Sequence, residues 1–146
     1  MMSPARVLVL ESDAVALSTI ERALRTVGFA VDAASDRVAA RGYLSPARDQ
    51  YHVALVASRL GSGDEVSGPG FVREIRGHSA RCVAVLMISL GDSALCDGHA
   101  FVRKPVDPAL LPAQIVAAAA EHAGIAIGDP AATMRQTVAA CATPPK

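Results

Sequence analysis

The stretch Val7-Leu8-Val9-Leu10-Glu11-Ser12-Asp13 places a buried strand directly before the start of a helix. Its four consecutive apolar residues are typical of a strand that is covered on both faces, and the polar cluster at 11–13 can cap a helix. Apolar residues then recur at helical spacing over residues 17–27, and Gly28 follows in the position of a C-terminal helix stop. The sequence therefore begins with a strand–helix unit.

The same alternation of strand and helix patterns continues to residue 122. Further strands are predicted at 29–34, 53–57, 83–88 and 100–103. Further helices are predicted at 36–44, at 70–77 and before residue 122, where the helix begins at Asp107-Pro108 or at Pro112. Strands that alternate with helices form parallel sheets through right-handed crossovers. We therefore predict an α/β fold with a doubly wound five-stranded parallel sheet.

The last two predicted strands lie close together in the sequence. A full helix with its flanking loops would need roughly five to seven residues more than 90–99 provide, so we predict a shortened fourth helix of one turn at 92–96. The (βα)5 unit then forms one domain over residues 5–122. Residues 123–146 are expected to be a flexible tail with at most a short helix at 134–140, too short for a DNA-binding or catalytic output domain.

The composition agrees with this architecture and argues against several functions. Hydrophobic residues make up 51% of the 146 residues but aromatic residues only 3%, which predicts a core of Ala, Val, Leu and Ile. The net charge of zero provides no long-range positive field for nucleic acid. Cys82, Cys96 and Cys141 match no zinc or disulfide pattern. Without a signal peptide or an apolar run of ~18 residues, we expect a cytoplasmic protein with no membrane or nucleic-acid partner.

Polar residues follow four of the predicted strands. In doubly wound sheets the functional crevice lies at the carboxyl ends of the strands. The segments expected at that edge are Glu11-Ser12-Asp13, Ala57-Ser58-Arg59, Ser89-Leu90 and Lys104-Pro105.

In their order along the chain, these strand ends resemble the receiver domain of bacterial response regulators, a flavodoxin-like family. Residues 6–13 (RVLVLESD) resemble the first strand with its acidic pair, and residues 53–60 (VALVASRL) resemble the strand that carries the phosphoacceptor. Residues 85–89 (VLMIS) resemble the strand that ends in the switch Thr or Ser. Residues 101–105 (FVRKP) resemble the aromatic-x-x-Lys-Pro segment, the most distinctive of the four. The similarity covers about residues 5–122.

The resemblance also shows where this sequence departs from the family. In receivers an Asp accepts the phosphoryl group, two more carboxylates hold Mg²⁺, and a Lys and a Ser or Thr bind the phosphoryl oxygens. Here the acceptor position is Ala57 and the acidic pair is Glu11-Ser12, while Ser89 and Lys104 are present. The resemblance therefore implies a pseudo-receiver that is not an enzyme and has no cofactor. Glu11 is the only candidate metal ligand, for weak Mg²⁺ binding at most.

Two further expectations concern the vestigial pocket, which we define as Glu11, Ser12, Asp13, Ala57, Ser89 and Lys104. With the other carboxylates missing, Lys104 is expected to form a salt bridge with Glu11, which would hold the pocket in one state. Phe101 occupies the family's switch aromatic beside Ser89, although a core side chain is the more ordinary role for a Phe in a strand.

The leading prediction is a stand-alone, phosphorylation-independent protein-interaction module of bacterial two-component signalling. Its partner would be a histidine kinase, a phosphotransfer protein or another regulator, and a homodimer is compatible with the fold. The first alternative is a small-anion or nucleotide sensor that uses Ser89 and Lys104. The second is a receiver that is phosphorylated at a relocated residue, with Asp13, Ser58 or Asp64 as candidates. The long 61–69 loop and the shortened 90–99 segment predict remodelled binding surfaces.

Overall fold

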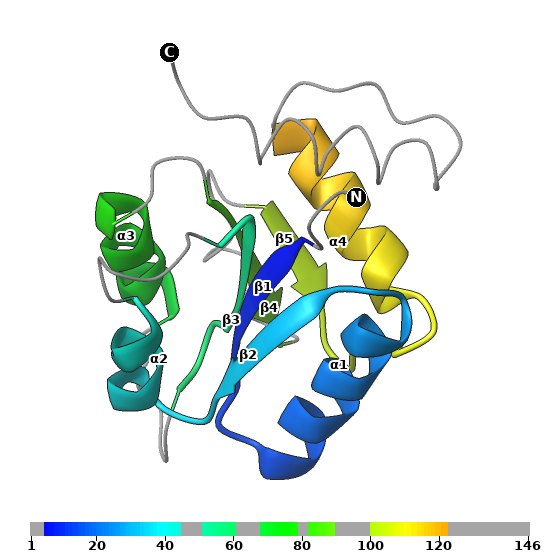
Figure 1. The fold of residues 1–146 in the computed structure, drawn as a ribbon, viewed down its shortest axis with the longest axis horizontal. Coiled ribbons are helices and arrows are strands. Elements are labelled where there is room, and N and C mark those ends of the chain that lie inside the picture. The colour runs from blue at the N-terminus through cyan, green and yellow to red at the C-terminus, as the bar shows by residue number, and fades with distance from the viewer. Residues whose placement is uncertain (1–4, 45–50, 61–67, 79–81, 90–99, 123–146) are drawn as a thin grey trace.

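The computed structural model describes residues 5–44, 51–60, 68–78, 82–89 and 100–122. Five strands form one sheet, in which every neighbouring pair is parallel and the order is β2-β1-β3-β4-β5. The strands are β1 (Arg6–Leu10), β2 (Ala30–Ala34), β3 (Val53–Ala57), β4 (Val83–Ile88) and β5 (Ala100–Arg103). The helices are α1 (Ala14–Thr26), α2 (Arg37–Tyr43), α3 (Gly68–His78) and α4 (Leu111–His122) (Figure 1). The predicted doubly wound five-stranded parallel sheet is confirmed.

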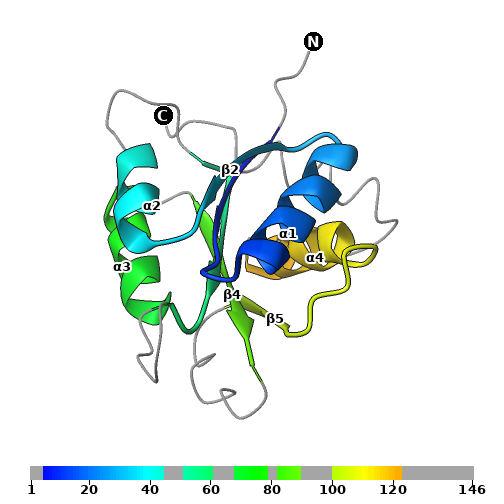
Figure 2. The same ribbon diagram turned by 90° about the horizontal axis from the view of Figure 1, so that it is seen from below.

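The helices form two layers, with α1 and α4 on one face of the sheet and α2 and α3 on the other (Figure 2). The central strands are therefore covered twice, and every residue of β3 and β4 is buried. This double coverage explains why these segments are continuously apolar, without the alternation of a half-exposed strand. Each amphipathic helix adds a narrow apolar stripe, such as Ile20 and Leu24 of α1 or Phe71 and Ile75 of α3.

Local capping sets the ends of the first helix as predicted. The Asp13 side chain accepts hydrogen bonds from the backbone N–H groups of Val15 and Ala16, at 2.9 and 3.0 Å. After the helix, Gly28 has a φ of 100°, a left-handed conformation that glycine adopts without steric cost. Asp13 thus sits at the junction between the end of β1 and the start of α1, where it is exposed.

One predicted helix start is wrong by two residues, and of the two starts predicted for the last helix only the later one agrees with the structure. Helix α3 begins at Gly68, two residues before the predicted start, and places Pro69 in its first turn, where no N–H is needed. At the other helix, Asp107 caps only a turn, in which its carboxylate accepts from the Ala109 N–H at 2.9 Å. Helix α4 begins at Leu111, close to the alternative start predicted at Pro112.

Several predictions fall outside the described residues. These are the shortened fourth helix at 92–96, Asp64 and most of the 61–69 loop, and the tail at 123–146 with its short helix. Within the ranges that are described, no helix is both long enough and apolar enough to cross a membrane.

Candidate functional site

The carboxyl edge of the sheet brings together four of the predicted site residues around one pocket. Glu11, Asp13, Ser89 and Lys104 all line this pocket, which has a volume of about 570 Å³. They come from the ends of β1 and β4, which flank the central strand β3, and of β5, the edge strand beside β4. The remaining walls are mostly apolar and come from α1 and the segment after β5; they comprise Val15, Ala16, Thr19, Ile20, Pro105, Val106 and Pro108.

An ion pair occupies the polar end of the pocket. The Lys104 Nζ atom donates to Glu11 Oε2 at 2.8 Å, and the Glu11 side chain is only 3% exposed. The other carboxylate oxygen, Oε1, accepts from the Asp13 N–H at 3.2 Å. The Lys104 backbone N–H donates to the Ile88 carbonyl at 2.8 Å, which ties the lysine to the end of β4. The structure therefore contains the expected salt bridge, and both oxygens of the carboxylate have a donor.

The position of the acceptor is covered by protein. Ala57 is fully buried at the end of β3, and its methyl group offers no nucleophile. The following residue, Ser58, is 1% exposed, and its carbonyl accepts from the Gly68 N–H at 3.0 Å. A Cβ atom on Gly68 would lie 2.7 Å from Ser58 Cα, so the start of α3 packs directly on the backbone at this strand end. This packing leaves Ser58 little access to a phosphodonor.

The donor set does not fit a magnesium site of the receiver type. Ser12, in place of the second carboxylate, is exposed and neutral. Glu11 already binds Lys104, and Asp13 uses its Oδ1 atom to cap α1. Over the ranges the structure describes, no group of three His, Cys, Asp or Glu side chains could hold a metal ion. Mg²⁺ needs several oxygen ligands in near-octahedral geometry, and two carboxylates that are already engaged in an ion pair and a helix cap do not meet that requirement.

The aromatic residue of β5 lies at the surface. Phe101 is 41% exposed, and the Arg103 guanidinium lies over its ring with 5.6 Å between Cζ and the ring centroid. The expectation that Phe101 is a core side chain is therefore wrong. The reason is that β5 is an edge strand, so the side chain is not enclosed as it would be in β3 or β4. A switch role for Phe101 and Ser89 stays a prediction.

The apolar wall of the pocket was not predicted. Val15, the second residue of α1, is 77% exposed although it is a large aliphatic side chain. A Val on the otherwise polar face of this helix was the only sequence signal. The contribution of Pro105, Val106 and Pro108 depends on how the segment after β5 passes α1, which local sequence patterns do not specify.

No protein-family model matches the sequence, and no curated protein matches it. Many solved structures match, and many of these are receiver domains. A response regulator receiver protein from Sinorhizobium medicae is 17% identical over 81% of this chain and 96% of its own, with a TM-score of 0.67. A response regulator from Burkholderia pseudomallei, solved with a phosphorylated aspartic acid, a calcium ion and citrate, is 18% identical over 82% of this chain and 72% of its own (TM-score 0.64).

A third match carries a different description. The adenylate cyclase from Rhodopirellula baltica is 20% identical over 92% of this chain and 90% of its own, with a TM-score of 0.63. At these identities the likeness concerns the fold. Strand order, parallel pairing and the flanking helices all agree with it, and the chain therefore has the fold of a response regulator receiver domain.

Proposed function

We propose that this chain is a receiver-like domain of two-component signalling that binds a protein partner without being phosphorylated. The observation that carries the proposal is the ion pair between the buried Glu11 and the partly exposed Lys104, at the strand end next to Ala57. The resemblance implies that in receivers the equivalent lysine faces the acceptor Asp and binds the phosphoryl oxygens once that Asp is phosphorylated. Here the ammonium group already has a carboxylate partner, and the adjacent strand end has no carboxylate to receive a phosphoryl group.

The ion pair would keep the carboxyl edge in one conformation. Leaving the buried Glu11 carboxylate without its cation costs several kcal/mol unless another partner compensates. An event that displaces Lys104 from Glu11 would therefore have to supply a replacement anion and a way to neutralise the carboxylate. Constitutive binding through surface complementarity needs neither, which is why we favour it over a switch.

The pocket wall supplies a plausible contact surface for that partner. Val15 lines the pocket and its side chain is 77% exposed, and Val106 and Pro108 line the same wall. Exposed aliphatic side chains around a concave site favour contact with an apolar side chain of another protein. Because the fold is that of a receiver domain, we propose a histidine kinase, a phosphotransfer protein or another regulator as this partner.

The decisive experiment is a phosphorylation assay read by intact mass. The chain is incubated with Mg²⁺ and a small acyl-phosphate donor, and we expect no gain of ~80 Da. The double variant Ser12→Asp/Ala57→Asp is the matched control, because it restores both missing carboxylates. A phosphoryl adduct on the unmodified chain, mapped to Asp13, Ser58 or Asp64, would refute the proposal in favour of a relocated acceptor.

The alternative of an anion or nucleotide sensor makes a different prediction. An anion would have to compete with Glu11 for Lys104, since this is the only cation among the residues that line the described pocket. We expect phosphate and common nucleotides to leave the melting temperature unchanged. A concentration-dependent rise that is lost in Lys104→Met would support the sensor instead.

A further inference from the structure

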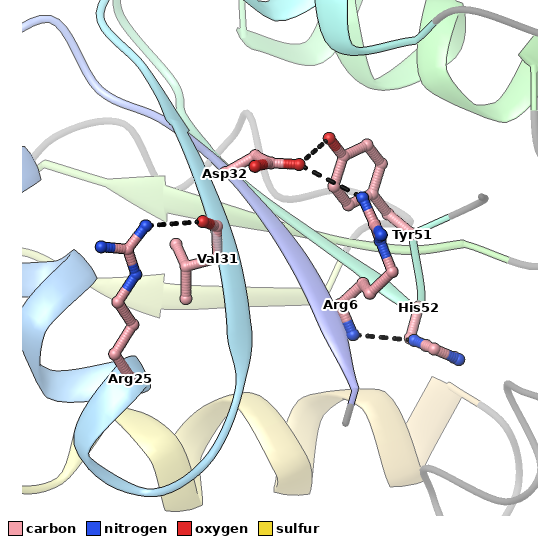
Figure 3. A network of polar contacts seen from close by, with 6 residues as sticks. All are labelled: Arg6, Arg25, Val31, Asp32, Tyr51 and His52. Carbon is pink, nitrogen blue, oxygen red and sulfur yellow. Dashed lines mark hydrogen bonds and ion pairs between the residues drawn. The ribbon is translucent and has the colours of Figure 1, made fainter. Parts of the chain in front are cut away.

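A second polar cluster lies at the opposite, amino edge of the sheet, away from the pocket. It contains Arg6 at the start of β1, Asp32 of β2, and Tyr51 and His52 directly before β3 (Figure 3). The Tyr51 hydroxyl donates to Asp32 Oδ2 at 2.5 Å, and Arg6 Nη2 lies 3.4 Å from the same oxygen. The Arg6 guanidinium also lies over the Tyr51 ring, with Cζ 5.4 Å from the centroid. The cluster therefore joins the first three strands in sheet order.

His52 is the residue that ties these strand starts together. Its backbone N–H donates to the Arg6 carbonyl at 2.9 Å, and its carbonyl accepts from the Val83 N–H at 3.0 Å. In addition, its side-chain Nδ1 atom accepts from the Arg6 backbone N–H at 2.8 Å. An imidazole nitrogen thus provides the acceptor for a backbone N–H at the beginning of β1.

The chemistry of this bond makes it sensitive to acid. A neutral imidazole that accepts at Nδ1 carries its proton on Nε2. The next proton must therefore bind Nδ1, the atom that holds the Arg6 N–H. Protonation places two donors face to face and adds a second positive charge beside the Arg6 guanidinium. The bond between His52 and Arg6 cannot survive that change.

We propose that His52 is an acid-sensitive latch that holds the amino end of β1 against β3 when neutral and releases it when protonated. Arg6 is the charged residue in direct contact with His52, and Asp32 and Tyr51 lie beyond it, bonded to or packed on the Arg6 guanidinium. Cys82 directly precedes Val83, whose N–H binds the His52 carbonyl, and Arg25 of α1 is bonded to the Val31 carbonyl on the far side of β2. Asp32 is already shared between Arg6 and Tyr51, so it is poorly placed to stabilise an imidazolium.

The direction of the pH effect agrees with this geometry. Burial, and then the positive charge of Arg6, lower the pKa of His52 below its ordinary value of 6.5. The unfolded chain therefore binds this proton more readily than the folded chain. Stability is highest above the unfolded pKa and falls as the pH drops through the lower, folded pKa. Release of the latch is therefore expected below pH 6.5, as the folded protein takes up this proton.

Nuclear magnetic resonance on the full chain tests the latch directly. The ¹⁵N chemical shifts of the His52 ring report its tautomer and its titration. Hydrogen exchange of the Arg6 amide reports the hydrogen bond from this amide to His52 Nδ1. As His52 titrates, we expect the protection factor of the Arg6 amide against hydrogen exchange to fall by about fivefold, the equilibrium equivalent of one net hydrogen bond. An Arg6 amide whose protection is unchanged while His52 titrates would overturn the proposal without any variant.

The variant His52→Asn provides the second arm. The asparagine amide oxygen can replace Nδ1 as an acceptor but does not titrate, so this variant should lose the pH dependence of Arg6 protection over the range in which His52 titrates in the unmodified chain. His78→Asn, at the end of α3, is the matched control and should keep the dependence. Unaltered pH dependence in His52→Asn would also contradict the latch.

Discussion

At the scale of single residues, Glu11 and Lys104 are unequal members of their ion pair. The Glu11 side chain is 3% exposed, whereas the Lys104 side chain is 29% exposed. An unpaired Lys104 can therefore reach water, while an unpaired Glu11 carboxylate stays in the protein interior with one N–H donor from Asp13. Removing the lysine should cost more than removing the negative charge.

We expect Lys104→Met to lower the free energy of unfolding by about 2–4 kcal/mol, because it leaves a buried carboxylate without its cation. Glu11→Gln should cost about 1–2 kcal/mol, since the amide can still accept from the Asp13 N–H. The double variant should be more stable than Lys104→Met alone. Denaturant titrations at neutral pH measure all three. Equal losses of unfolding free energy in the two single variants, or a loss in the double variant equal to their sum, would show that Glu11 and Lys104 do not stabilise each other as an ion pair.

At the scale of elements, the contact between α3 and the end of β3 determines how the acceptor position is covered. Gly68 begins α3 and lies against the backbone of Ala57 and Ser58, where no larger residue fits without movement. Gly42, within α2, has no atom within 4 Å of the position that a Cβ would take. The two glycines therefore differ in environment although both are helical.

We expect Gly68→Ala to destabilise the protein by about 1–3 kcal/mol, because the methyl group pushes α3 away from β3. Gly42→Ala should instead stabilise it by about 0.5–1 kcal/mol, through the higher helix propensity of alanine. Thermal or denaturant unfolding of the two variants gives the comparison. A neutral Gly68→Ala would mean that α3 does not pack on this strand end as closely as the structure indicates.

At the scale of the whole molecule, the sheet separates two candidate binding faces. The α1–α4 layer carries the pocket with Val15, while the α2–α3 layer carries Val38 on the other side of the sheet (Figure 2). These two valines are closely matched, because each is the second residue of its helix, follows an Asp cap and is 77% or 76% exposed. They allow one face to be tested against the other.

For a partner co-purified from the native cells, we expect Val15→Glu to weaken binding by about tenfold, the equivalent of burying one aliphatic side chain. Val38→Glu should change the affinity by less than about twofold. Calorimetry with the purified partner measures both. Equal affinities for Val15→Glu and the unmodified chain, or a greater loss in Val38→Glu, would move the interface away from the pocket.

The sequence by itself determined the layered α/β fold. The continuous apolar runs at 53–57 and 83–88 indicate strands that are covered on both faces. The helix caps at Asp13 and Gly28 are predicted from the residues next to them in the sequence. The sequence also determined that the end of β3 has no nucleophile at the acceptor position, since the methyl group of Ala57 is unreactive in any conformation. The local sequence does not determine the helix starts at Gly68 and Leu111, because Gly and Pro are compatible with both loops and first turns.

Only the tertiary structure decided which side chains share an environment. Glu11 and Lys104 are 93 residues apart, and their distance of 2.8 Å depends on the sheet order that sets β1 and β5 on either side of β3 and β4. The exposure of Phe101 follows from the position of β5 at an edge, and the role of His52 follows from the alignment of two strand starts. These properties arise from packing over long sequence separations, and no local pattern encodes them. The Glu11–Lys104 pair is predicted only through the resemblance to receiver domains, which supplies the strand order that local patterns lack.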